Sequence, residues 1–124
     1  MTDEDGRPRI LLISAGNIND MQVAGELIER AAGRFTRLIA DKGYDTNAIR
    51  AAVAAQGGEA VIPSTAARRV PIFYNRTTYR ARNLVERLWC RLKDCRRVAT
   101  RYDKLATNFL SGALLAAIFT YWCN

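Results

Sequence analysis

The sequence predicts an α/β fold in which a sheet, at least partly parallel, is covered by helices. Three short apolar runs, set off by turn-forming residues, have the length and composition of buried strands. Between and after them, apolar residues recur every three or four positions, which is the spacing of one helix face. This alternation favours parallel strands, because a parallel pair needs a long crossover connection that is usually a helix.

The first half of the chain contains the alternating strands and helices. In order, we expect a strand at 9–14 (RILLIS), a helix at 21–32, a strand at 35–40 (FTRLIA), a helix at 46–56 and a strand at 59–63 (EAVIP). Asn19 or Asp20 is placed to cap the first helix, and Asp45 is placed to cap the second. Gly33 ends the first helix and the pair Gly57-Gly58 ends the second, since glycine readily adopts the backbone conformation found after a helix.

The second half of the chain is basic and mainly helical. Residues 64–76 form a connector with Arg68, Arg69 and Arg76, which either contacts phosphates or is a solvated surface loop. A single helix is expected at 79–97, because this stretch has no Gly or Pro and its apolar residues share one side. These apolar residues are Leu84, Val85, Leu88, Leu92 and Cys95.

A last helix is expected at 105–122, after a break at 98–103. Its apolar run at 109–123 is shorter than the roughly 20 residues that cross a bilayer, so we interpret it as a core helix. The start of the chain is acidic and polar and has no secretory signal, which favours a cytoplasmic protein.

Composition limits the possible functions. At 124 residues and 49% hydrophobic, the chain is long enough for a single domain at 1–124. Its net charge of +7 predicts an anionic partner, either nucleic acid or an acidic membrane surface. Histidine is absent, which excludes Ser/His and Cys/His nucleophilic mechanisms. Cys90, Cys95 and Cys123 include no C-x2-C pair, so no structural zinc site is expected, and Cys95 is expected to pack as a small apolar residue.

Four polar residues of the helix at 79–97 share the side away from its apolar face. They are Tyr79, Arg82, Glu86 and Lys93. One reading is that Glu86 binds a divalent cation while its neighbours hold phosphates. The other is an ordinary Arg82–Glu86 pair on a solvated face, worth about 0.2–0.5 kcal/mol. Periodicity alone favours the second reading.

Two aspartates follow the strand at 35–40. In open α/β sheets, ligands collect at the carboxyl ends of strands, which is where Asp41 lies. Asp41 is therefore either a site residue or an ordinary loop carboxylate, whereas Asp45 has the structural role of a helix cap.

The spacing Tyr79-x2-Arg82-x3-Glu86-x6-Lys93 resembles the Y-x2-R-x3-E-x6-K signature of bacterial insertion-sequence transposases of the DDE type. Flanking segments such as RARNLVER and RRVATRYDK are similar too, and the resemblance extends from Asp3 to Trp122. It implies an RNase-H-like mixed sheet flanked by helices. It also implies that Asp41, in LIADKGYD, and Glu86 are the second and third catalytic acids of a two-metal Mg²⁺ or Mn²⁺ site. Tyr79, Arg82 and Lys93 are implied to bind DNA.

The chain departs from the family pattern at its start. The family's first catalytic aspartate lies on a strand upstream of the stretch that resembles residues 2–24, and Asp3 and Asp5 look like turn residues instead. The N-terminal DNA-binding segment usual in the family is missing too. The resemblance thus implies the carboxyl-terminal part of a transposase, lacking the first strand. We expect either an upstream polypeptide or reading frame that supplies the first Asp, or the remnant of a decayed element.

The function implied by the resemblance is DNA transposition: hydrolysis of a phosphodiester at the element end, then attack of the freed 3′ hydroxyl on target DNA. With one acid missing, this catalytic fragment is expected to be inactive alone. Its expected partners are DNA, the upstream polypeptide and, in the transposition complex, further copies of the chain, but no membrane. Alternatives are a noncatalytic basic nucleic-acid-binding domain and, third, a membrane-surface protein that uses the last helix.

Overall fold

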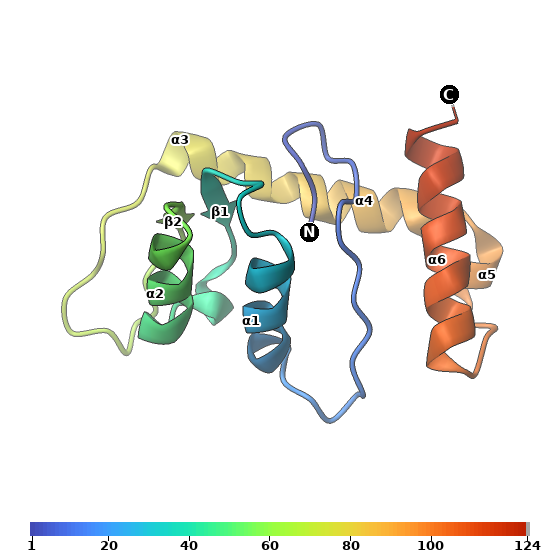
Figure 1. The fold of residues 1–124 in the computed structure, drawn as a ribbon, viewed down its shortest axis with the longest axis horizontal. Coiled ribbons are helices and arrows are strands. Elements are labelled where there is room, and N and C mark those ends of the chain that lie inside the picture. Colours follow the sequence, from blue (N-terminus) through green and yellow to red (C-terminus); the bar gives the residue numbers. More distant parts are fainter. Residues whose placement is uncertain (124) are drawn as a thin grey trace. The chain divides into compact units, whose positions relative to one another are not determined.

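The computed structural model describes residues 1–123, which divide into two compact units (Figure 1). The middle unit comprises residues 14–82, and the terminal unit combines residues 1–13 with the chain from residue 83 onward. Each unit has a buried apolar cluster of its own.

The middle unit is built around a small parallel sheet. Its elements in order are α1 (Asp20–Arg30), β1 (Arg37–Ile39), η1 (Lys42–Tyr44), α2 (Asn47–Ala55), β2 (Glu59–Val61), α3 (Arg76–Tyr79) and η2 (Arg80–Arg82), where η denotes a 3₁₀ helix. Strands β1 and β2 pair in parallel, with Arg37 opposite Glu59 and Ile39 opposite Val61. The predicted α/β class, the strands at 35–40 and 59–63 and their parallel pairing are confirmed, although both strands are shorter than expected. The RNase-H-like form of the sheet stays a prediction.

The core of the middle unit lies between its helices and its sheet. Helix α1 contacts α2, and α2 contacts β2. The buried residues that form this core cluster are Ala24 and Ile28 of α1, Ile49 and Val53 of α2, and Ile62 just after β2. The two positions on each helix are four residues apart, which places them on one face.

Local side chains begin the two main helices of this unit. Oδ1 of Asn19 accepts a hydrogen bond from the Met21 amide at 3.1 Å, which confirms Asn19 as a cap of α1. At α2, however, the cap is Thr46, whose hydroxyl accepts from the Ile49 amide at 3.2 Å. The prediction that Asp45 caps this helix is therefore wrong. Asp45 is structural for another reason, because its buried side chain binds Arg50 and Arg68.

The predicted strand at 9–14 is wrong. Residues 9–14 form no strand, and the nearest pairing is an isolated antiparallel bridge between Thr2 and Pro8. A tight turn brings the chain back on itself, so the amides of Arg9 and Ile10 both donate to the Met1 carbonyl, at 3.0 and 3.4 Å. A strand needs a neighbouring strand for its backbone groups. This run instead contributes Leu11 to the core of the terminal unit.

The terminal unit is helical. Its helices are α4 (Asn83–Lys93), α5 (Arg96–Ala99) and α6 (Ala106–Tyr121). Its core consists of Leu88, Leu92, Val98, Ala113 and Ala117. Arg97 of α5 binds Asp103, in the connection to α6, through two hydrogen bonds of 2.7 Å.

The prediction of one continuous helix at 79–97 is wrong in two places. The helical path tightens to the 3₁₀ form at Arg80–Arg82, and α4 ends at Lys93 before α5 begins at Arg96. Cys95 has an extended backbone, with φ −76° and ψ 107°, at the position that precedes α5. All three cysteines are exposed, so the expected packing of Cys95 in the core is also wrong.

Helix α6 matches the last predicted helix to within a residue at each end. As a core helix it buries only Ala113 and Ala117 fully, while Leu115 is 55% exposed and Phe119 is 66% exposed. The guanidinium groups of Arg7 and Arg9 lie 5.4 and 5.6 Å from the ring centre of Trp122, so cation–π contacts hold the start of the chain against the end of this helix.

Among the residues that the structure describes, no helix combines the length and the apolar character needed to span a bilayer.

Candidate functional site

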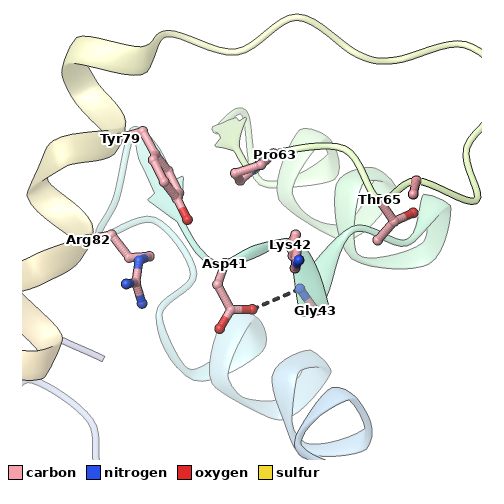
Figure 2. A pocket seen from close by; sticks show the side chains of 8 residues that line it. Asp41, Lys42, Gly43, Pro63, Thr65, Tyr79 and Arg82 are labelled. Carbon is pink, nitrogen blue, oxygen red and sulfur yellow. Dashed lines mark hydrogen bonds between the residues drawn. The ribbon is translucent and has the colours of Figure 1, made fainter.

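The middle unit contains a pocket at the carboxyl ends of its two strands (Figure 2). Its volume is about 610 Å³, within the usual range of small-ligand pockets. Asp41 lies just beyond β1 and Pro63 just beyond β2. Because parallel strands end at the same edge of a sheet, these two segments meet there although α2 separates them in sequence. The lining residues are Asp41, Lys42, Gly43, Pro63, Thr65, Ala66, Tyr79 and Arg82.

Asp41 is fixed by the short helix that follows it. Its side chain precedes η1 as the cap, and Oδ1 accepts a hydrogen bond of 2.8 Å from the Gly43 amide. Figure 2 shows this bond beside the pocket. A Cβ atom on residue 43 would lie 2.9 Å from the same oxygen, so only glycine leaves room for the carboxylate in this position. The sequence therefore fixes the direction of the Asp41 carboxylate as well as its place.

Tyr79 and Arg82 line the same pocket from α3 and η2. The two residues are three apart in a helical path, so their side chains point to the same side, and Figure 2 shows both extending toward the pocket that Asp41 lines. The ring of Tyr79 meets that of Tyr74 edge to face, with centres 5.5 Å apart. The sequence-predicted residues Asp41, Tyr79 and Arg82 are thus brought to one pocket.

The charges around the pocket are mixed. Lys42 and Arg82 carry positive charge beside the negative Asp41. The pKa of the Tyr44 phenol is raised, first by burial and then by the negative charges of Asp20 and Asp41. A phosphate at this pocket would meet two cationic side chains, and its negative charge would be repelled by Asp41 unless a cation lay between them.

The other two predicted site residues belong to the terminal unit. Glu86 and Lys93 both lie on α4 and are exposed. They are seven residues apart, which is two helical turns, so they share one side of α4. The predicted stripe of four residues is therefore divided between the units, with Tyr79 and Arg82 in the middle unit. The roles of Glu86 as a metal ligand and of Lys93 as a DNA contact stay predictions.

At one residue, Arg68, the basic connector at 64–76 does not fit the predicted contact with phosphates. The Arg68 side chain is 19% exposed, and its guanidinium is bound to Asp45 and Asn47, so it is not available to phosphates. Arg69 and Arg76 are exposed and keep both interpretations open.

The pocket supplies some, but not all, of the oxygen ligands that a divalent cation needs. Carboxylate oxygen is the ligand that Mg²⁺ and Mn²⁺ prefer, and Asp41 brings one carboxylate to the pocket. Within residues 1–123, no three His, Cys, Asp or Glu side chains gather into a group that could hold a metal ion. Asp41 can therefore be one ligand, and the remaining oxygens must come from other groups, including the phosphate itself.

Sequence reasoning missed several lining residues, among them Lys42, Thr65 and Ala66. The parallel pairing of β1 and β2 could have predicted the lining residues that follow β2. If β1 and β2 end at one edge, the residues after the second strand belong to the same site as those after the first. The place of Thr65 also depends on contacts with Asp45 that no local pattern indicates.

Comparison with known proteins gives one match. A protein family model described as Transposase DDE domain matches residues 1–121, which is nearly the whole chain. Searches of curated proteins and of solved structures give no match.

Proposed function

The chain belongs to the transposase DDE domain family, and we propose that it is the catalytic part of a DNA transposase that cleaves and joins phosphodiester bonds. The observation that carries the proposal is the family match over residues 1–121. The pocket at the strand ends supports it, because an aspartate and two cationic side chains line the same cavity. The positive net charge of the chain suits a DNA substrate.

We assign the chemistry to five residues. Asp41 and Glu86 act as the metal-binding carboxylates, which requires the two side chains to share one site. Arg82 and Lys93 bind the phosphates next to the cleaved bond, and Tyr79 contacts a phosphate, sugar or base. Bound Mg²⁺ or Mn²⁺ supplies Lewis-acid stabilisation of the charge on the reacting phosphate. The protein residues hold the phosphodiester in place and direct the attacking and leaving oxygens.

Two carboxylates are few for a site of this kind. We propose that an upstream polypeptide or reading frame supplies a further aspartate, and that this chain alone is inactive or nearly so. We further propose that residues 1–124 act as one partial RNase-H-like catalytic domain, in a complex that can contain more than one copy. The reaction then takes place in the bacterial cytoplasm, where the DNA is.

The test is metal-dependent nicking of a supercoiled plasmid that carries the element end. The chain is supplied together with the upstream polypeptide, and Mg²⁺ or Mn²⁺ is added. We expect Asp41→Asn and Glu86→Gln each to abolish nicking, whereas the matched variants Glu29→Gln and Asp94→Asn keep it, because these two exposed carboxylates lie outside the proposed site. Full nicking by either site variant would falsify the assignment of that residue.

A second candidate function is a noncatalytic nucleic-acid-binding domain. It is favoured by the exposed arginines of the terminal unit, which carry positive charge whether or not a metal binds: Arg87, Arg91 and Arg96. The salt dependence of DNA binding does not separate the two functions, because both predict a steep slope. The metal dependence of nicking does separate the two functions. A chain that binds DNA tightly, but does not nick it with any metal ion or with the upstream polypeptide, has the second function.

A further inference from the structure

One side of the pocket is formed by a segment that has no regular secondary structure. Pro63, Thr65 and Ala66 line the pocket, yet no helix or strand occurs between the end of β2 at Val61 and the start of α3 at Arg76. Such a segment has no backbone ladder to fix it, so its position depends on side-chain contacts. We call Pro63–Ala66 the pocket wall.

Within the pocket wall, Oγ of Ser64 accepts a hydrogen bond from the Ile72 amide at 2.8 Å, and the contacts at Thr65 lead to Asp45. The Thr65 amide donates to Oδ2 of Asp45 at 2.8 Å, and the Thr65 hydroxyl lies 3.4 Å from the same oxygen. Arg68, just past the wall, donates from Nε to Oδ2 and from Nη2 to Oδ1, both at 3.0 Å. This two-point contact between planar groups fixes the guanidinium in orientation as well as in distance. Nη1 of Arg68 also donates to Oδ1 of Asn47 at 2.9 Å.

The other side of Asp45 is held by α2. Nε of Arg50 donates to Oδ1 of Asp45 at 2.8 Å, and Nη2 of Arg50 donates to the Ile62 carbonyl, also at 2.8 Å. Arg50 thereby connects the helix to the residue that precedes the pocket wall. The Asp45 side chain is 0% exposed, against 13% for Arg50 and 19% for Arg68. A buried carboxylate with two guanidinium partners is stable as a set, but it is strongly destabilised when one member is removed.

The charge of Asp45 persists under acidic conditions. The hydrogen bond from Arg68 is the main cause that holds the pKa of this carboxyl well below its ordinary value, although burial acts in the opposite direction. The Thr65 amide and Arg50 lower this pKa further. The titratable and charged groups that face Asp45 are thus the two arginines, which stay charged at any ordinary pH.

We propose that Asp45 is a positioning residue of the candidate site: by binding Thr65 and Arg68, it holds Pro63–Ala66 as the wall of the pocket that Asp41 lines. The inference rests on the proposed function for the identity of the ligand, a phosphate-bearing piece of DNA. Asp45 itself is buried and touches no ligand. It acts through the wall, which faces the substrate.

The first measurement is hydrogen exchange of individual amides in the ¹⁵N-labelled full chain. In Asp45→Asn, we expect the Thr65 amide to exchange at least about tenfold faster, since its buried charged acceptor is replaced by a neutral group. The Val53 amide, inside α2, should change less than about threefold. The matched control is Asp103→Asn, which disrupts a similar two-point pair with Arg97 in the terminal unit and should leave Thr65 unchanged.

The second measurement is binding of a 5′-phosphorylated thymidine dinucleotide, followed by the amide shifts of Lys42 and Gly43. We expect Asp45→Asn to raise the Kd at least about fivefold and Asp103→Asn to leave it unchanged. If Asp45→Asn does not fold, Arg68→Lys provides the same test, because it removes the two-point contact between Asp45 and the residue just past the wall and leaves Arg50 to balance Asp45.

The outcomes test the positioning role of Asp45 separately from the proposed transposase function. Faster exchange at Thr65 with Val53 protected, together with weaker dinucleotide binding, supports positioning. Unchanged exchange at Thr65, or equal acceleration at Thr65 and Val53, overturns it. If the unmodified chain binds no dinucleotide and shows no metal-dependent nicking, the proposed function fails, while the exchange experiment still decides whether Asp45 holds the wall.

Discussion

Replacing Gly43 by Ala should damage the candidate site without damaging the fold. The added Cβ would lie 2.9 Å from Oδ1 of Asp41 and 4.0 Å from its Cγ, whereas ordinary contact begins at about 3.4 Å. No other group lies within 4 Å of this Cβ. The Asp41 side chain must therefore move by about half an ångström or rotate, and the hydrogen bond from residue 43 to Oδ1 is then weakened or lost.

The expected change in stability is small because two effects nearly cancel. Losing a capping hydrogen bond costs about 0.5–2 kcal/mol. Restricting the unfolded chain by replacing Gly with Ala, at a residue whose φ is not positive, returns about 0.4–1 kcal/mol. The net effect on the free energy of unfolding therefore lies between a gain of about 0.5 kcal/mol and a loss of about 1.6 kcal/mol. Catalysis is more sensitive, since displacing a reacting group by about 1 Å can cost about 100-fold in rate.

The assay compares nicking rate with unfolding free energy in Gly43→Ala. We expect nicking, measured with Mg²⁺ and the upstream polypeptide, to fall about 10- to 100-fold, while urea denaturation shows a loss of no more than about 1.6 kcal/mol. The control is Gly25→Ala inside α1, where a Cβ meets nothing within 4 Å. It should stabilise the chain by about 0.5–1 kcal/mol and leave nicking unchanged. Unchanged nicking in Gly43→Ala would refute the reasoning, because Asp41 would then not need its observed direction.

Three further predictions concern the two cores and the response to acid. Gly58→Ala should destabilise by about 1–3 kcal/mol in urea denaturation, because its Cβ would lie 2.7 Å from the Phe35 ring and 3.2 Å from buried Val53; an unchanged midpoint would contradict this packing. Leu92→Ala should lose about 2–5 kcal/mol and lower the melting temperature, since Leu92 is 0% exposed; a smaller loss would mean that the terminal core can collapse around the gap. The depressed pKa of Asp45 contributes stability that is fully present above the ordinary carboxyl pKa of about 4 and is lost as the pH falls below it. The urea midpoint should therefore depend less on pH in Asp45→Asn than in the unmodified chain between pH 5 and pH 2. An equal pH dependence in both proteins would exclude Asp45 as a source of acid sensitivity.

Features governed by nearby residues were predictable from the sequence. The strands at 37–39 and 59–61 follow from composition within a few positions, and the cap of α1 was narrowed to Asn19 or Asp20, of which the structure has Asn19. The placement of Asp41 at the end of the first of these strands predicted that it would lie at a ligand-collecting edge, and it lines the pocket there. Its role as a metal ligand stays a prediction.

Features that depend on distant residues were not predictable. Asp45 and Thr46 are both good capping residues, but Asp45 instead binds Arg50, Thr65 and Arg68, and the last two lie 20 and 23 positions away. The apolar run at 9–14 has the composition of a strand, but whether a strand forms depends on a neighbour that composition does not specify. The end of α4 at Lys93 was missed because Asp94 and Cys95 are not strong helix breakers.

The parallel pairing of β1 and β2 has a consequence for the order of folding. Parallel strands cannot be joined by a tight hairpin, and here the connection contains η1 and α2. A pair of three-residue strands is too small to be stable alone, so we expect the strands to pair after α2 has formed and packed against α1. We therefore expect the ligand-binding edge to be among the last parts of the middle unit to take shape, and substitutions that weaken α2 to delay its appearance without altering its final form.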